Sequence, residues 1–188
     1  IKLGLDLKKT YLLFVAMRVN APAKGFDYLS KALEIWAQNN PSKVAQTELM
    51  IVGGLTDDEI IHSLPLLVNS MGHISDPNQM IDIYHAADLF ITPSLEENLP
   101  NTIMEAMACG TPSIGFNTGG IPEMIAHKEN GYVAQKMDSN DLATGINWLL
   151  KNLEIASIEG RKFAEKNYSE DIVTEKHIDL YLKAIKKV

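Results

Sequence analysis

Short apolar runs alternate with longer amphipathic segments along most of this chain, and this alternation limits the possible folds more than any other feature. The first run, Tyr11–Val19, is continuous and rich in strand-forming residues, which is typical of a strand buried on both faces. The next segment, Gly25–Asn39, has apolar residues at helical spacing. Further strands are predicted over Thr47–Val52, Leu66–Met71, Asp88–Thr92, Pro112–Phe116 and Gly131–Ala134, and helices over Pro77–Ala87, Thr102–Cys109 and Ile121–His127, with Asp57 capping a short helix.

From Asp138 onward the pattern is helical only. It predicts three consecutive helices over Ser139–Leu153, Glu154–Asn167 and Ser169–Lys187. The predicted fold class is therefore α/β: a Rossmann-like, doubly wound parallel sheet of about six strands with extra C-terminal helices. Ligands bind at the carboxyl ends of the strands in such sheets, so the residues directly after each strand are the candidate site residues.

Composition narrows the classes of function. The chain has 188 residues, enough for one domain with a substantial core, and a formal net charge of −7 without clustered basic residues, which argues against nucleic acid as a partner. Its one cysteine, Cys109, fits a reducing, cytoplasmic compartment and is interpreted as a small core residue. No apolar run approaches the roughly 18 residues that a membrane span needs. The chain starts at Ile1, in the middle of a pattern, and we interpret it as a piece of a longer protein.

Two cations follow the first predicted strand. Arg18 and Lys24 lie in Arg-Val-Asn-Ala-Pro-Ala-Lys-Gly after that strand, and Gly25 opens the next helix. A guanidinium and an ammonium at the carboxyl edge of a parallel sheet suit an anion, above all a diphosphate, and the amides of a helix N-terminus add positive potential. Spacing alone favours the alternative, that these are two solvated surface cations.

Two acids follow the fourth predicted strand. Glu97 lies in the loop and Glu105 on the next helix, whose first residues are Asn101, Thr102 and Ile103. The backbone N–H groups of those three residues lack helical partners, so they can hold an anion while the carboxylates accept hydrogen bonds from sugar hydroxyls. The alternative is that Glu105 is an exposed helix residue and Glu97 an acid favoured by the helix dipole.

The remaining candidates for chemistry are weak. The five histidines form no ligand-spaced set with each other or with Cys109, and no Asp-x-Asp motif occurs, so no metal is implied. The chain also contains no Walker loop, Gly-x-Ser-x-Gly or Gly-x-Gly-x-x-Gly motif.

The segment around the two acids carries a family resemblance. Glu97 and Glu105 are separated by seven residues, and Ala106-Met107-Ala108 and Gly110-Thr111-Pro112 follow. This pattern resembles the retaining glycosyltransferases called group 1, or family four. Other stretches match the family in the same order along the chain: Arg18 with Lys24-Gly25, Gly72-His73-Ile74-Ser75, Ala87 to Ser94, Gly119-Gly120-Ile121-Pro122-Glu123 and Asn130-Gly131-Tyr132-Val133.

The resemblance implies an architecture and a reaction. Members have two Rossmann-like domains facing across a cleft, and residues 1–188 would be the C-terminal domain, which binds the nucleotide-sugar donor. The sugar would pass to a glycan or lipid-linked acceptor with its anomeric configuration retained. The acceptor would lie mainly on the N-terminal domain, to which Ser169–Lys187 would cross back. The full protein would be cytoplasmic, and a peripheral position at the inner face of the membrane is compatible with a lipid-linked acceptor.

The resemblance also implies roles for single residues. Arg18 and Lys24 would hold the donor diphosphate, Glu97 the sugar hydroxyls and Glu105 the ribose, while the main chain at Ile74 would contact the base. One departure lies between the two acids, where the family often has Gly-Phe-Gly and this chain has Asn98-Leu99-Pro100. Proline supplies no N–H, so the amide contacts in this segment would come from Leu99 and Asn101.

Two rival interpretations remain at the level of the sequence. One is a nucleotide-sugar epimerase of the same paired-domain architecture, against which the ordered acids and the Ala-Met-Ala segment argue. The other is a flavodoxin-like binding or signalling domain without enzymatic activity. A receiver-type module would need clustered acids after the first strand, where this chain has Arg18.

Overall fold

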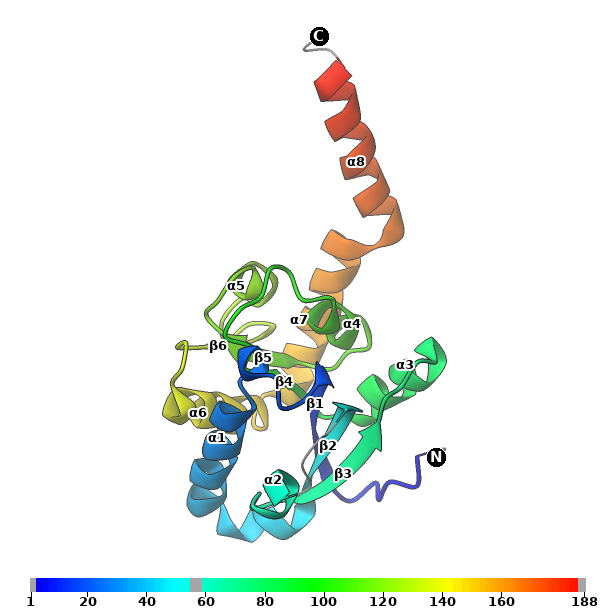
Figure 1. Ribbon diagram of the computed structural model, residues 1–188. Coiled ribbons are helices and arrows are strands. Elements are labelled where there is room, and N and C mark those ends of the chain that lie inside the picture. The colour runs from blue at the N-terminus through cyan, green and yellow to red at the C-terminus, as the bar shows by residue number, and fades with distance from the viewer. Residues whose placement is uncertain (1–2, 55–58, 186–188) are drawn as a thin grey trace.

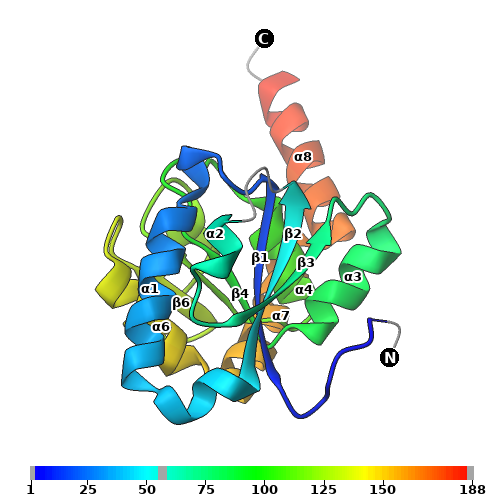
Figure 2. The same cartoon turned by 60° about the horizontal axis from the view of Figure 1, so that its bottom comes forward.

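Six parallel strands form one sheet within residues 3–54 and 59–185, which the computed structural model describes. Their spatial order is β3-β2-β1-β4-β5-β6, so the chain winds outward from β1 to β3 and then returns to the other side of β1 (Figures 1 and 2). The bounds are Thr10–Arg18 for β1, Thr47–Gly54 for β2, Leu67–Gly72 for β3, Leu89–Thr92 for β4, Ser113–Phe116 for β5 and Gly131–Ala134 for β6. This arrangement confirms the predicted doubly wound α/β sheet, and it places a topological switch point between β1 and β4.

Helices cover both faces of the sheet. Helices α1 and α6 pack on one face, while α3, α4 and α7 pack on the other. The helical bounds are Phe26–Asn39 for α1, Glu59–His62 for α2, Pro77–Ala86 for α3, Asn101–Ala108 for α4, Ile121–Met124 for α5, Ser139–Leu149 for α6, Leu153–Tyr168 for α7 and Glu170–Ile185 for α8, with short 3-10 turns η1 at Pro22–Lys24 and η2 at Pro41–Gln46.

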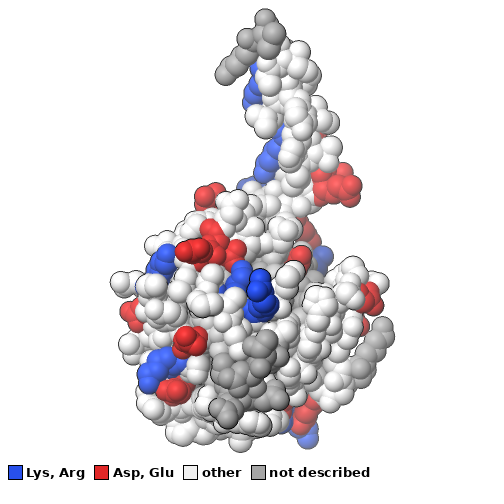
Figure 3. All heavy atoms as spheres, in the orientation of Figure 1, with Lys and Arg blue, Asp and Glu red and all other residues white. Residues whose placement is uncertain are grey.

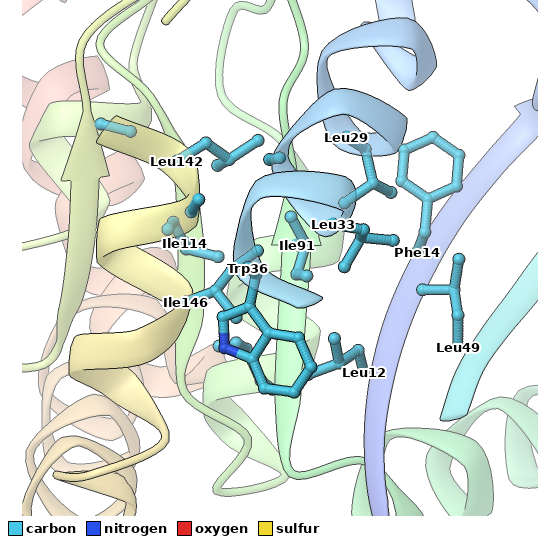
Figure 4. Close-up of a cluster of buried hydrophobic side chains, with 14 of the residues drawn as sticks. Leu12, Phe14, Leu29, Leu33, Trp36, Leu49, Ile91, Ile114, Leu142 and Ile146 are labelled. Atoms are coloured by element: carbon cyan, nitrogen blue, oxygen red, sulfur yellow. The ribbon is translucent and has the colours of Figure 1, made fainter. Parts of the chain in front are cut away.

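Strand β1 supplies side chains to both layers because alternate residues of a strand point to opposite faces. Leu12 and Phe14 enter the cluster under α1 and α6, and Leu13 enters the cluster under α3 and α4. Figure 4 shows the first cluster, where the side chains from α1 and α6 meet those of the sheet. Its labelled members come from β1, α1, β2, β4, β5 and α6: Leu12, Phe14, Leu29, Leu33, Trp36, Leu49, Ile91, Ile114, Leu142 and Ile146.

The predicted elements agree with the structure apart from local differences. Helix α5 ends at Met124 instead of continuing to His127. The buried Asn130 side chain accepts a hydrogen bond from the Ala126 N–H and donates one to the Met124 carbonyl, which replaces helical bonds at this point. The predicted cap at Asp57 lies outside the described residues.

Helix α8 extends away from the rest of the domain (Figure 1). It has no buried residue, and five of its apolar side chains are at least half exposed: Ile178, Leu180, Tyr181, Leu182 and Ile185. The described helices include none that is long and apolar enough to cross a membrane.

Because α8 contains no buried residue, removing it should cost little stability. A chain that ends at Ser169 is expected to keep its free energy of unfolding to within about 0.5 kcal/mol, as for surface changes in general. Urea denaturation followed by circular dichroism measures this difference. A loss of more than about 2 kcal/mol would show that α8 packs on the sheet domain in solution.

Candidate functional site

Two loops meet at the carboxyl ends of β1 and β4, at the switch point of the sheet. The loop after β1 runs from Arg18 to Gly25, and its Ala23 carbonyl accepts a hydrogen bond from the Leu95 N–H in the loop after β4, at 2.8 Å. Gly25 lies directly against the second loop, with φ +67°, and a Cβ at this position would collide with the Pro93 carbonyl. The first loop therefore needs glycine here for its conformation and for this close approach.

A third loop, which joins β5 to α5, holds the acidic loop from its other side. The Gly120 N–H donates to the Asn98 carbonyl at 2.5 Å, and the Thr118 hydroxyl donates to the Leu95 carbonyl at 3.2 Å. A Cβ on Gly119 would collide with the Glu97 carbonyl. The family resemblance includes this Gly119-Gly120 pair, but the sequence implied no role for the pair or for Thr118. The structure shows that they position the backbone on both sides of Glu97.

Lys24 and Glu97 form an ion pair across the first two loops. The Lys24 Nζ lies 2.5 Å from the Glu97 Oε1, and the two side chains are 36% and 16% exposed. Arg18 is exposed at the end of β1 and forms no ion pair with a described residue. Figure 3 shows basic side chains next to acidic ones near the middle of one face of the domain. Arg18 is therefore free to bind an anion. Lys24 can bind one by exchanging its partner Glu97 for it.

The N-terminus of α4 presents backbone donors at the same edge of the sheet. The N–H groups of Leu99, Asn101 and Thr102 have no acceptor among the described residues. The Ile103 N–H differs, because it donates to the Pro100 carbonyl at 3.0 Å, and the Ile103 side chain is fully buried. Of the amides predicted from the sequence, that of Ile103 is thus occupied within the chain.

Ile74 and Glu105 line one cleft between α3 and α4. The cleft has a volume of about 640 Å³, and its walls also include Met80, Tyr84 and Cys109. The Tyr84 hydroxyl donates to the Glu105 Oε2 at 2.9 Å. Burial raises the pKa of Tyr84 far above its usual range, and the negative charge of Glu105 adds to the effect, so this hydroxyl stays protonated. The structure thus brings together the two residues that the resemblance connects with the base and the ribose.

Cys109 is the C-cap of α4 and is only partly a core residue. It packs against the buried cluster beneath α3 and α4, but it is half-buried and lines the cleft. Burial raises the pKa of its thiol, an effect that the Arg161 guanidinium opposes and the Glu105 charge reinforces. At neutral pH it is therefore a thiol without nucleophilic character.

The described residues include no group of three His, Cys, Asp or Glu side chains that could hold a metal ion. The groups singled out at this edge of the sheet are Arg18, Lys24, Glu97 and the backbone donors of α4, with Glu105 in the cleft between α3 and α4. This set can bind a phosphorylated ligand through the cations and amides, and it can accept hydrogen bonds from hydroxyl groups through the carboxylates.

Comparisons with known proteins point to one family. The family model for group 1 glycosyl transferases matches residues 9–152. An uncharacterised glycosyltransferase of Haemophilus influenzae is 30% identical over 159 residues, which cover 81% of this chain and 44% of that protein. D-inositol 3-phosphate glycosyltransferase of Rhodococcus jostii is 30% identical over 181 residues, which cover 89% of this chain and 39% of that protein. The chain therefore spans less than half the length of these relatives.

Solved structures share the fold over nearly the whole chain. Sucrose-phosphate synthase of Thermosynechococcus elongatus has a TM-score of 0.82 at 23% identity and covers 100% of this chain, which corresponds to 48% of that protein. Anabaena HepE, solved in complex with UDP-glucose, has a TM-score of 0.72 at 25% identity, and the match covers 93% of this chain and 49% of HepE. The family match favours the glycosyltransferase interpretation over the two rival interpretations. It confirms the resemblance drawn from the motifs: the chain belongs to the group 1 glycosyltransferases.

Proposed function

We propose that this chain binds the nucleotide-sugar donor of a glycosyltransferase that passes the sugar to a glycan or lipid-linked acceptor with retention of the anomeric configuration. The observation that carries the proposal is the Lys24–Glu97 ion pair at the switch point of the sheet, with Arg18 at the end of β1 and the free amides at the start of α4 on the same edge. HepE, which shares this fold, was solved with UDP-glucose, and this supports a nucleotide sugar as the ligand. Retention follows from the family resemblance.

In this proposal the diphosphate lies between Arg18 and the N-terminus of α4. The N–H groups of Asn101 and Thr102 donate to phosphate oxygens, and the helix dipole favours their negative charge. As the bond to the sugar breaks, negative charge builds up on the departing diphosphate. The two cations and the amides stabilise this charge where it develops, which lowers the barrier of the reaction.

Donor binding exchanges the partners of Lys24 and Glu97. The diphosphate takes over the Lys24 ammonium, and the Glu97 carboxylate becomes available to the hydroxyls of the donor sugar. The pair thus keeps two half-buried charges compensated while no donor is present, because an uncompensated buried charge is costly. Leu99, whose side chain is 45% exposed, lies between this pair and α4 and contributes its N–H.

The nucleoside occupies the cleft between α3 and α4. The ribose hydroxyls donate to Glu105, and the base lies at the main chain of Ile74. A thermal-shift panel of UDP, GDP, ADP and TDP tests the proposal, and at least one of them should stabilise the chain. The two cations neutralise the phosphates without a dedicated metal in this proposal, so EDTA should leave the shift unchanged. A panel without any shift would refute nucleotide binding.

The substitution Glu105→Gln is expected to weaken the best nucleoside diphosphate of this panel by roughly ten- to a hundredfold. It removes one charge-assisted hydrogen bond to a hydroxyl, worth about 1.5–3 kcal/mol. Titration calorimetry measures the loss, and thermal unfolding without ligand checks that the fold is intact. Equal affinities of the variant and the parent would make Glu105 a helix-surface acid only.

The chain alone is expected to bind the donor and to transfer no sugar. We propose that it is the C-terminal half of a two-domain enzyme, whose other half holds the acceptor and is contacted by the exposed apolar side chains of α8. Domain closure excludes water and aligns the reacting atoms, which can account for several kcal/mol of the barrier. Incubating the chain with the nucleotide sugar that binds best and an acceptor extract tests this division of roles between the two domains. Turnover equal to that of the full-length enzyme would contradict it.

We also propose that the full protein lies in the cytoplasm, and that it associates peripherally with the membrane if its acceptor is lipid-linked.

A further inference from the structure

Tyr84 forms a rigid part of the cleft wall. Tyr84 lies in the last turn of α3 and is 1% exposed. Its ring packs edge-on against the ring of Phe90, and the two ring centroids are 6.0 Å apart. Its carbonyl accepts a hydrogen bond from the buried Thr111 hydroxyl at 2.6 Å, which fixes the backbone as well. The phenol oxygen therefore has a fixed position, and the one hydrogen bond recorded for it goes to the Glu105 Oε2.

Glu105 is by contrast an exposed residue of α4 whose side chain has no other recorded partner among the described residues. A free glutamate on a helix surface samples many rotamers, and ordering it when a ligand binds has an entropic cost. The tyrosine hydroxyl removes this freedom beforehand. It occupies Oε2, so that Oε1 is left without a hydrogen bond to a described residue, on a side chain that lines the cleft.

We propose that Tyr84 is a positioning residue that holds Glu105 ready for the ribose, and that the pair makes the cleft select ribonucleoside over deoxyribonucleoside diphosphates. This inference rests on the proposed function, because it requires a nucleoside in the cleft. It adds a class of donor to that function: nucleotide sugars whose ribose keeps both hydroxyls.

The selectivity follows from the hydrogen bond to Glu105 that a deoxyribose cannot make. A site built to hydrogen-bond a hydroxyl discriminates strongly against a ligand that lacks it, because the polar groups of the site lose their partner. A carboxylate that is free to rotate could turn toward water and recover its solvation. One held by Tyr84 keeps Oε1 in place for the hydroxyl, so a ligand that lacks this hydroxyl loses the whole charge-assisted hydrogen bond.

The chain offers a matched control for removing the tyrosine hydroxyl. Tyr132 on β6 is also buried, at 4% exposure, and its hydroxyl donates to the Asp141 Oδ1 on α6 at 2.8 Å. It does not line the cleft between α3 and α4. Tyr84→Phe and Tyr132→Phe thus remove the same group from the same kind of bond, one inside the proposed site and one outside it.

The experiment measures affinities by calorimetry for UDP, ADP and GDP, each with its 2′-deoxy and 3′-deoxy counterparts. For the ribonucleotide that binds best, the parent should discriminate against at least one deoxy form by about ten- to a hundredfold. Tyr84→Phe should weaken the ribonucleotide about five- to tenfold and leave the deoxy form unchanged, so that the ratio shrinks. Tyr132→Phe should keep the parent ratio.

Equal weakening of both forms by Tyr84→Phe would overturn the inference, because it would show a structural role alone. A parent without discrimination would overturn it too, while nucleotide binding as such would stand. A parent that binds TDP but none of these three diphosphates would overturn this inference alone, and one that binds none of the four would refute the proposed function as well. If Tyr84→Phe does not fold, Glu105→Asp is measured instead. This substitution keeps the negative charge, but its shorter side chain moves the carboxylate away from the Tyr84 hydroxyl. Full discrimination by Glu105→Asp would show that the tyrosine contact is not needed.

Discussion

Replacing Arg18 and Lys24 together by alanine is expected to lower the affinity for a nucleoside diphosphate by about a hundredfold, while the affinity for the matching nucleoside stays nearly unchanged. Each cation supplies a charge-assisted hydrogen bond to phosphate, worth about 1.5–3 kcal/mol at full strength. The Lys24 side chain is 36% exposed and Arg18 is an exposed residue, so solvent screening reduces that sum. Calorimetry with the nucleoside and its diphosphate, each at two salt concentrations, measures the difference.

A matched control for the lysine lies on α1. Lys31 pairs with Glu34 at 2.8 Å, again a lysine beside a glutamate, but at 62% exposure and outside the loops of the site. Lys31→Ala should leave both affinities unchanged. Added salt should weaken the diphosphate bound to the parent and affect the double variant less, because little phosphate attraction remains to be screened. Equal losses for nucleoside and diphosphate would show that the two cations do not contact phosphate.

The substitution Gly25→Ala is expected to destabilise the fold by about 3 kcal/mol more than Gly72→Ala does. Both glycines have left-handed backbone, with φ +67° and +63°, so both substitutions share a conformational cost of about 1–2 kcal/mol. They differ in their surroundings. A Cβ at Gly72 meets nothing within 4 Å, whereas one at Gly25 collides with the Pro93 carbonyl in the neighbouring loop.

Chemical denaturation of the two variants separates the contact from the backbone conformation. Relief of the collision has to push the loop after β1 away from the loop after β4, which breaks the bond between the Leu95 N–H and the Ala23 carbonyl. The same movement separates Lys24 from Glu97, so residual folded Gly25→Ala protein should also bind diphosphate weakly. Equal destabilisation by the two substitutions would mean that the loops are not held at this distance in solution.

The order of strands and helices could be predicted because each element has its own local signal. The run from Tyr11 to Arg18 is apolar enough for a buried strand, and Phe26, Leu29, Leu33 and Trp36 repeat at helical spacing. Differences arose where a side chain competes with the backbone, as Asn130 does at the end of α5. That competition depends on a buried residue six positions further along the chain, which periodicity does not detect.

The sequence alone determined that a parallel sheet forms, that Arg18, Lys24, Glu97 and the start of α4 follow strands and so lie at its carboxyl edge, and that the motifs are those of the group 1 glycosyltransferases. Only the tertiary structure decided which groups at that edge contact one another. Lys24 pairs with Glu97 across 73 positions, and Tyr84 holds Glu105 across 21. The physical reason is one of range: secondary structure depends on neighbours a few residues apart, whereas these contacts depend on how loops and helices pack around β1 and β4 and on the side-chain rotamers that this packing allows.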